Sequence, residues 1–92
     1  MLDARIVIVG GGLSGLALAD QLSRSGKEWV LLEARARLGG RVLSVADPNT
    51  ATCFDVGPAW IWPHNDRMLN MSERLKLKVF KQYASGKLVF QD

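Results

Sequence analysis

The first third of the chain changes from a continuous apolar run to helical spacing and back to a continuous run. Ile6–Val9 is β-branched with no polar alternation, which is typical of a parallel strand buried on both faces. Apolar residues then recur at helical spacing, at Leu16, Ala19 and Leu22. Gly26 stands where a left-handed C-terminal cap is expected, and Trp29–Leu32 forms the second continuous run. The pattern predicts strand, helix and a second, parallel strand.

A hairpin is predicted between residues 42 and 56. Val42–Ala46 has the character of a short strand, and Asp47–Thr50 is a cluster of turn formers. Thr52–Val56 is expected to return as the partner strand.

The last third of the chain predicts one helix and two strands. Asn65 or Asp66 is expected to cap a helix that ends in the basic stretch 74–78. One face of this helix is predicted to contain Met68, Leu69, Ser72 and Leu75. Val79–Tyr83 and Lys87–Gln91 then have the composition of strands around a short turn.

The turn between the first strand and the first helix carries the GxGxxG pattern, in Gly10, Gly12 and Gly15. In that pattern the first glycine makes a tight turn, the second lets backbone approach a pyrophosphate, and the third lets helix and strand pack closely. The helix opens near Leu13 and Ser14, so its unpaired N–H groups and positive dipole end are expected to face phosphates. Glu33 ends the second strand and can accept hydrogen bonds from ribose hydroxyls. This order of parts favours a dinucleotide site over an incidental strand-to-helix turn.

The segment from Glu33 to Val42 reads EARARLGGRV. Its paired glycines would let backbone pass close to a diphosphate, and its arginines offer cationic forks, of which at least one is expected to be structural. The segment closely resembles the E-A-R-x-R-x-G-G-R signature of the flavin-containing amine oxidase superfamily. That signature is far more specific than the glycine fingerprint alone, and it favours a ligand site over a solvated basic loop.

The resemblance continues at residues 54–61, which read FDVGPAWI. In the superfamily a similar D-x-G-x-x-W stretch brings backbone beside the flavin, and Gly57, Ala59 and Trp60 match it. Many members carry a second glycine where this chain has Pro58, which has no backbone N–H to donate. Trp60 is expected near the flavin, whereas Trp62 is expected to be a core or interface aromatic.

The resemblance implies an α/β fold: a Rossmann-like βαβ FAD/NAD(P)-binding domain of the three-layer type, truncated, with a small β excursion. It also implies an FAD-dependent oxidoreductase that transfers hydride from a C–N or C–C bond of an amine or related substrate to flavin, which is the reactive group. No catalytic acid, base or nucleophile is predicted. The cofactor ligands it implies are Gly10, Gly12, Leu13, Ser14 and Gly15 at the pyrophosphate, Glu33, Ala34 and Arg35 at the adenosine, Gly39, Gly40 and Arg41 at the diphosphate and ribityl side, and Gly57, Pro58, Ala59 and Trp60 toward the flavin ring.

Composition and a few single residues limit the ligands, metals and compartment that the sequence predicts. The net charge of +3 suits an anionic ligand but is too small to argue for nucleic acid, and no apolar run is long enough to span a bilayer. The isolated His64 predicts no metal site. The single Cys53 is expected to be a small buried residue in a reducing, cytoplasmic compartment. Ala17–Ala19 loosely imitates a signal cleavage site, but Asp3 and four glycines interrupt the apolar region that a secretory signal requires.

Length limits the functional prediction. The 92 residues are expected to form one N-terminal FAD-binding domain or fragment, with the substrate domain absent, from a larger oxidoreductase or a truncated product of such a gene. One alternative is a nicotinamide-dependent reductase domain, which has no reason to carry the Arg37–Arg41 segment. Another is a non-catalytic module that binds nucleotide or a partner without turnover. Unpaired sheet edges and uncovered apolar surface would favour self-association of such a chain.

Overall fold

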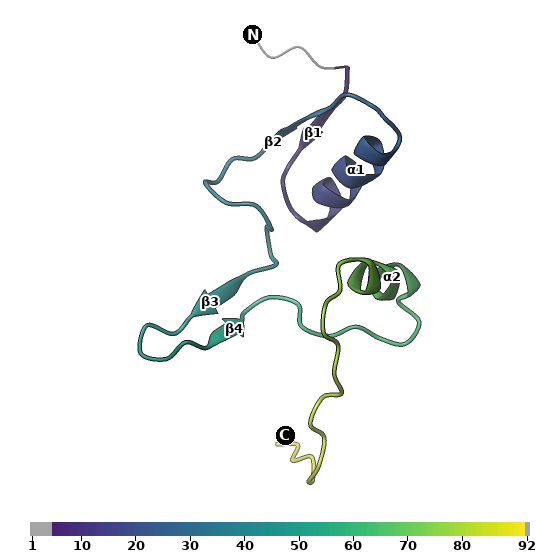
Figure 1. The fold of residues 1–92 in the computed structure, drawn as a ribbon. Helices are drawn as coiled ribbons and strands as arrows, with labels where there is room; N and C mark the ends of the chain where they lie inside the picture. Colours follow the sequence, from purple (N-terminus) through teal and green to yellow (C-terminus); the bar gives the residue numbers. More distant parts are fainter. Residues whose placement is uncertain (1–4, 92) are drawn as a thin grey trace. The chain divides into compact units, whose positions relative to one another are not determined.

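The computed structural model describes residues 5–91, so Asp3 of the signal-like segment lies outside the described residues. The chain divides into two compact units, Met1–Ala59 and Trp60–Asp92, and Figure 1 labels their elements. The first unit contains a βαβ segment and a hairpin, and the second contains one helix followed by an extended segment.

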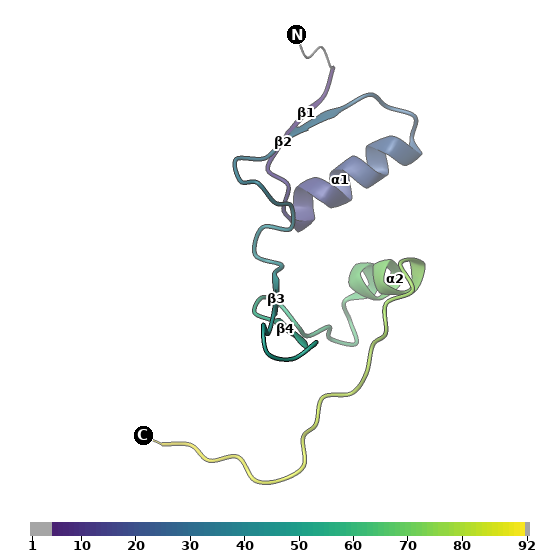
Figure 2. The same cartoon turned by 60° about the vertical axis from the view of Figure 1, so that its left-hand side comes forward.

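The βαβ segment consists of β1 (Val7–Val9), α1 (Leu13–Arg24) and β2 (Val30–Leu32). The two strands are parallel and hydrogen-bonded, as predicted, and α1 runs between them in the chain and lies along one side of the pair (Figure 2). Ile8 of β1 and Ala19 of α1 form the core, each only 4% exposed. Leu16 and Leu22 are half-buried, which confirms the helix face that their spacing predicts.

The expectation that β1 is buried on both faces is wrong. Ile8 points under α1, but its neighbours on the other face, Val7 and Val9, are exposed, Val9 to 83%. Successive side chains of a strand alternate between faces, and within residues 5–91 a helix covers only one face of this sheet. The described residues therefore supply two of the three layers that the fold class has.

The end of α1 is closed by backbone hydrogen bonds and a glycine. At the end of α1, Lys27 N–H donates to Leu22 C=O at 2.9 Å and Gly26 N–H donates to Ser23 C=O at 3.1 Å, which is a Schellman motif. Gly26 has φ of +67°, so the predicted left-handed glycine cap is confirmed. The chain then turns directly into β2.

The predicted hairpin forms from β3 (Ser44–Ala46) and β4 (Cys53–Asp55), which are antiparallel. Asp47 organises the turn, because its carboxylate accepts hydrogen bonds from Asn49 N–H and Thr50 Oγ1, both at 2.9 Å. These bonds lower the pKa of Asp47 below its ordinary value. Every residue of both strands is exposed, including Cys53. The expectation of a buried cysteine is therefore wrong.

In the second unit, α2 (Asp66–Arg74) occupies the predicted position, and His64 lies in the turn before it. Asn65 is the N-cap residue, but its side chain does not cap the helix, which differs from the prediction. Its Oδ1 accepts a hydrogen bond from Trp62 N–H at 2.9 Å instead. Ser72 is the buried residue of the predicted face, and its hydroxyl donates to Met68 C=O at 2.8 Å.

The far end of α2 departs from the prediction. Leu75, expected on the apolar face, is exposed and already lies beyond the helix. Leu77 N–H donates to Ser72 C=O at 2.8 Å and Lys76 N–H to Glu73 C=O at 3.0 Å, so a second Schellman motif ends the helix at Arg74, the first residue of the basic stretch 74–78. Lys76 takes the left-handed position with φ of +55°.

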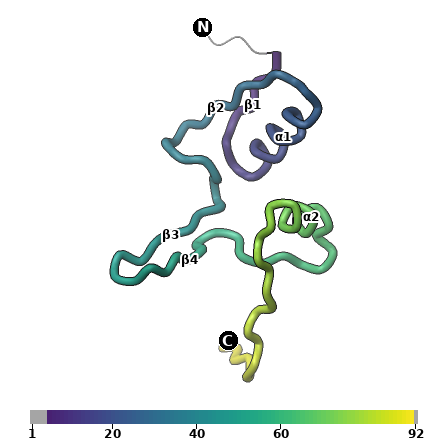
Figure 3. The backbone as a smooth tube through the Cα atoms, viewed as in Figure 1, coloured from purple at the N-terminus to yellow at the C-terminus, as the bar shows by residue number. Residues whose placement is uncertain are grey.

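The strands predicted at Val79–Tyr83 and Lys87–Gln91 do not form. Residues 77–91 have neither helix nor paired strand, and Figure 3 shows their extended course toward the C-terminus. Their large apolar side chains are among the most exposed in the chain, with Phe90 at 87%. A strand needs a partner for its backbone groups, and no other described segment pairs with this one.

Candidate functional site

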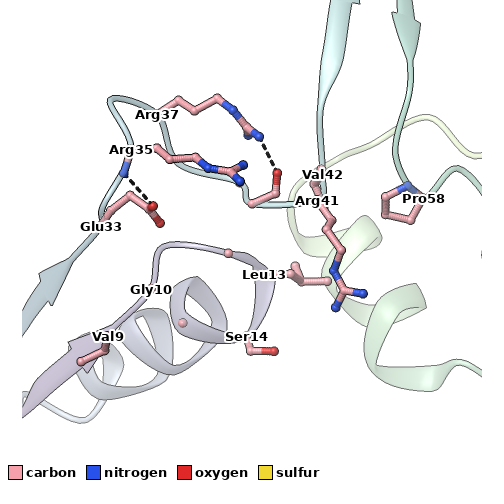
Figure 4. Close-up of a pocket in the computed structure, with 14 residues that line it drawn as sticks. Val9, Gly10, Leu13, Ser14, Glu33, Arg35, Arg37, Arg41, Val42 and Pro58 are labelled. Carbon is pink, nitrogen blue, oxygen red and sulfur yellow. Dashed lines mark hydrogen bonds between the residues drawn. The ribbon is translucent and has the colours of Figure 1, made fainter.

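A cavity of about 710 Å³ opens in the first unit where β1 and β2 end. Figure 4 shows the residues around it, which come from the glycine-rich turn, the start of α1, the segment after β2 and the segment after β4. The lining residues are Val9, Gly10, Gly12, Leu13, Ser14, Gly15, Glu33, Arg35, Arg37, Gly39, Gly40, Arg41, Val42 and Pro58.

The glycine-rich turn brings the start of α1 to the cavity. Gly10 N–H donates to Leu32 C=O at 2.7 Å, which extends the β1–β2 ladder to the first glycine. Gly15 packs so closely on the turn that a Cβ at this position would overlap the Gly10 carbonyl oxygen. The third glycine of the fingerprint is therefore required by the backbone itself, as the pattern predicts.

The N-terminus of α1 is free to attract an anion. Its N-cap, Gly12, has no side chain to occupy the unpaired N–H groups, and the first turn contains no acidic residue. Helix N-termini carry a partial positive charge and several N–H groups without intrahelical partners. Leu13 and Ser14, at this end of the helix, line the cavity.

The two glycine segments of the sequence meet directly. Gly39 N–H donates to Gly11 C=O at 2.8 Å, and Gly12 pairs with Gly39 in an isolated parallel bridge. A Cβ on Gly40 would come within 3.1 Å of Gly12 Cα. The turn after β1 and the arginine-glycine segment after β2 therefore form one continuous wall of the cavity.

Gly39 and Gly40 both adopt conformations that side chains rarely take, with φ of +107° and +59°. Val42 N–H donates to Gly39 C=O at 3.0 Å, which closes a tight turn around the pair. A Cβ on Gly39 would lie 2.7 Å from the carbonyl oxygen of Val42. The paired glycines are therefore needed for the shape of the turn.

Glu33 ties the end of β2 to the glycine-rich turn. Its Oε2 accepts a hydrogen bond from Gly11 N–H at 2.7 Å, and its Oε1 accepts one from Arg35 N–H at 3.0 Å, drawn in Figure 4. These bonds, the one from Arg35 first, lower the pKa of Glu33 below its ordinary value of 4.5. A carboxylate has about four acceptor positions, so Glu33 keeps capacity for a ligand hydroxyl.

The three arginines of the cavity differ in their contacts. Arg37 is half-buried, and its guanidinium donates to Gly40 C=O at 2.7 Å and to Leu38 C=O at 3.3 Å. Arg35 and Arg41 are exposed, and in Figure 4 the guanidinium of Arg41 lies beyond Leu13. Arg37 is thus the structural arginine that the sequence led us to expect. Three guanidinium groups against the single carboxylate of Glu33 make the cavity electropositive.

Most of the predicted ligand residues line this one cavity, including Pro58. Ala34, Gly57 and Ala59 do not line it, and Trp60 belongs to the second unit. Gly57 packs closely on the segment after β2, because a Cβ there would overlap the Arg41 carbonyl oxygen. Close packing against the segment after β2 explains why this position is glycine.

Three lining residues, Val9, Arg37 and Val42, and the buried Gly11 beside them were not among the predicted cofactor ligands. Val9 directly precedes Gly10 and Val42 directly follows Arg41, so their positions beside the motifs were a usable signal. Nothing in the sequence shows that Gly11 N–H bonds to a carboxylate 22 residues away.

Residues 5–91 contain neither a metal-binding cluster nor a membrane-spanning helix. This part of the chain has no group of three or more His, Cys, Asp or Glu side chains that could hold a metal ion. Within the same residues, neither helix is long and apolar enough to cross a membrane.

Comparison with known families finds a match over residues 8–75 to the NAD(P)-binding Rossmann-like domain. Among curated proteins, the chain is 39% identical over 90 residues to amine oxidase [flavin-containing] A of Sus scrofa, an alignment that covers 89% of this chain and 17% of that protein. It is 38% identical over 84 residues to amine oxidase [flavin-containing] of Danio rerio, covering 91% of this chain and 16% of that protein. The chain thus spans about a sixth of the length of these relatives.

Solved structures of putrescine oxidase resemble the chain as well. A double mutant of that enzyme superposes with a TM-score of 0.83 at 33% identity, over 92% of this chain and 18% of the other. The wild-type enzyme bound to putrescine gives a TM-score of 0.80 at 33% identity, over 89% of this chain and 18% of the other. The α/β Rossmann-like fold class and the resemblance to flavin-containing amine oxidases are both confirmed.

Proposed function

This chain belongs to the NAD(P)-binding Rossmann-like domain family, and from that premise we propose that it is the FAD-binding portion of a flavin-dependent oxidoreductase of the amine oxidase type. The proposal is supported by the relatives, which are flavin-containing amine oxidases, and by the likeness to putrescine oxidase. The substrate of the whole protein would be an amine or a related compound.

The direct contact between the two glycine segments carries the proposal. The Gly39 to Gly11 hydrogen bond of 2.8 Å joins the turn after β1 to the segment after β2 on one wall of the cavity. A dinucleotide needs two sets of phosphate contacts close together, and this wall provides glycine backbone, a helix N-terminus and arginines in one place.

Each part of the cavity suits a part of the cofactor. The start of α1, at Gly12 to Ser14, would bind the pyrophosphate through backbone N–H groups. Glu33 would accept hydrogen bonds from the adenosine ribose, with Arg35 beside it. Arg41 would contact the diphosphate at its ribityl side, and Pro58 would lie toward the flavin. Gly57, Ala59 and Trp60 do not line the cavity. Their position toward the flavin ring stays a prediction.

Bound flavin would supply the redox chemistry by accepting hydride from the substrate, and this chain would orient it. The electropositive wall would neutralise the diphosphate charge, and the β1–β2 ladder would give the binding residues a fixed base. The residues that select and cover a substrate would come from the rest of a longer protein.

Titration of the purified chain with FAD tests the proposal. We expect binding, seen as quenching of flavin fluorescence and retention of yellow colour through gel filtration. ADP should compete, because it carries the adenosine and diphosphate that the cavity is proposed to hold. A colourless chain that binds NADH and ignores FAD would favour the nicotinamide-dependent reductase instead.

Gly12→Ala separates ligand binding from folding. A Cβ at Gly12 would meet only Gly40 Cα, at 3.9 Å, so the variant should fold normally. The added methyl group would stand in the proposed path of the pyrophosphate, so FAD affinity should fall at least tenfold. Gly86→Ala, outside the cavity, is the matched control and should bind FAD like the original chain. Unchanged affinity in Gly12→Ala would contradict the proposed pose.

Two further properties belong to this proposal. The isolated chain is expected to self-associate, since Val7, Val9 and Leu32 are exposed beside unpaired strand edges. Analytical ultracentrifugation should show a concentration-dependent rise in mass.

A reducing, cytoplasmic compartment would keep the exposed Cys53 as a thiol, and fractionation of cells that produce the protein would test that placement.

A further inference from the structure

We propose that Arg37 is a positioning residue, which shapes the wall of the cavity from within the loop and does not itself bind the ligand. The inference rests on the proposed function for what the cavity holds, but the shaping of the loop stands on contacts present without any ligand. It separates Arg37 from the two other arginines of the same motif.

The contacts of Arg37 are with its own loop. One terminal nitrogen, Nη2, donates to Gly40 C=O at 2.7 Å, and the other, Nη1, donates to Leu38 C=O at 3.3 Å. Figure 4 shows the first of these bonds on the side of the loop away from Leu13 and Ser14. The guanidinium therefore joins two carbonyl groups that stand on either side of Gly39.

These carbonyls are the groups that a left-handed turn leaves without partners. Gly39 and Gly40 have φ of +107° and +59°, so the chain reverses here without regular secondary structure. Orphan carbonyl groups in a half-buried loop require donors, and a planar guanidinium can serve two of them at once. Lysine, with a single flexible ammonium group, cannot reproduce this fork geometry.

Arg35 and Arg41 differ from Arg37 in both exposure and contacts. Arg37 is half-buried and Arg41 is exposed, and among the described residues the Arg41 guanidinium has no hydrogen-bond partner. Arg35 lies beside Glu33, and its positive charge attracts the carboxylate of Glu33. Arg35 and Arg41 thus keep their donors for a ligand, whereas Arg37 has two of its five committed to the protein.

The loop that Arg37 holds also contacts the glycine-rich turn. Gly39, between the two bonded carbonyls, donates its own N–H to Gly11 C=O at 2.8 Å. Loss of the Arg37 fork would therefore loosen the junction between the two glycine segments, although Arg37 does not contact the turn after β1 itself. The expected consequence is a weaker site with an unchanged set of phosphate-binding charges.

The first test needs no ligand. We would compare the amide NMR signals of Gly39 and Gly40 in the free chain, in Arg37→Lys and in Arg37→Met, with Arg24→Lys at the end of α1 as the charge-matched control. Both Arg37 variants should shift these two signals, and the control should not. In the original chain, the Arg37 Nη protons should exchange with water more slowly than those of Arg41, a measurement that does not depend on how any variant folds.

The second test uses FAD titrations at several ionic strengths. Arg37→Lys and Arg37→Met should both weaken FAD binding about tenfold, the scale of charge-assisted hydrogen bonds, and both should keep the salt dependence of the original chain. Arg41→Gln should reduce that salt dependence, because a direct phosphate contact is lost.

Two results would overturn the inference. One is an Arg37→Lys chain with unmoved Gly39 and Gly40 signals, and the other is an Arg37→Met chain whose salt dependence falls as it does in Arg41→Gln. If the original chain binds no FAD, the proposed function fails, but the ligand-free NMR comparison still decides whether Arg37 holds the loop.

Discussion

Val7–Val9 and Leu88–Phe90 are both short runs of large apolar residues, yet only the first is a strand. β1 pairs with β2 in parallel register, and Ile8 at its centre is buried under α1. Residues 88–90 have no strand partner among the described residues, and all three side chains are exposed. Apolar composition is nearly the same in the two runs, so composition does not decide the outcome.

What differs is the availability of partners for the backbone. The ladder of β1 continues past its ends, through Val30 N–H to Ile6 C=O at 3.0 Å and Gly10 N–H to Leu32 C=O at 2.7 Å. An extended chain without such bonds gains nothing from β-propensity that offsets its lost conformational entropy. The βαβ segment should therefore respond strongly to substitution, and the segment after α2 weakly.

Gly15→Ala should break the βαβ segment and have the largest effect on stability of any substitution in this comparison. The new Cβ would overlap the Gly10 carbonyl oxygen, and backbone atoms can separate only by moving α1 from the turn. We expect a loss of about 3 kcal/mol in the free energy of unfolding. Urea denaturation followed by circular dichroism would measure it.

Gly86→Ala is the matched control for that variant. Nothing lies within 4 Å of its Cβ position, and the surrounding segment can relax the unfavourable φ of +118°. Its free energy of unfolding should stay within about 0.5 kcal/mol of the original value. Equal losses in the two glycine variants would mean that the segment after α2 is as well packed as the βαβ segment.

Truncation of apolar side chains sharpens the same contrast. Ile8→Ala should cost about 2 kcal/mol in unfolding free energy, because it removes most of a buried side chain and leaves a cavity under α1. Val89→Ala removes atoms that are already in water and should have almost no effect. Hydrogen exchange at the Gly10 and Val30 amides would report the first change. A marked effect of Val89→Ala would contradict the exposed state of its segment.

The two Schellman motifs permit a reciprocal exchange. Lys76→Gly should stabilise α2 by about 0.5 kcal/mol, because glycine adopts the left-handed φ of +55° without steric cost. Gly26→Ala should destabilise α1 by about 1 kcal/mol for the opposite reason. Amide hydrogen exchange in the last turn of each helix would measure both. Changes of the same sign in the two variants would mean that φ does not control these caps.

Glu33→Gln should alter how the site responds to pH. Hydrogen bonds from Arg35 and Gly11 N–H groups lower the pKa of Glu33 in the folded chain below its ordinary 4.5. The carboxylate therefore stabilises the turn at pH values above 4.5, and this contribution is lost as the pH falls through the lowered folded value. The original chain should show an acid-induced shift of the Gly11 amide NMR signal. Glutamine does not titrate, so the variant should lack this shift. Asp20→Asn serves as a control and should keep it.

Local sequence patterns were sufficient for much of the fold and site. Gly10, Gly12 and Gly15 predicted the turn, the helix and the cavity wall, because each acts on its immediate neighbours. Gly26 predicted the end of α1 for the same reason. Predictions failed where the answer depended on distant coverage: Cys53 was expected to be buried, and Val79–Tyr83 was expected to be a strand.

By itself, the sequence determined the order of strand, helix and strand, the position of the paired glycines and the positive character of the site. These follow from backbone dihedral preferences and side-chain spacing, which are properties of neighbouring residues. Only the tertiary structure decided that Arg37 bonds to its own loop, that Gly57 packs on the Arg41 carbonyl, and that Glu33 reaches Gly11. The Glu33 and Gly57 contacts join groups 16 or more residues apart, and the sequence does not distinguish the role of Arg37 from those of Arg35 and Arg41, so the folded path of the backbone determines all three.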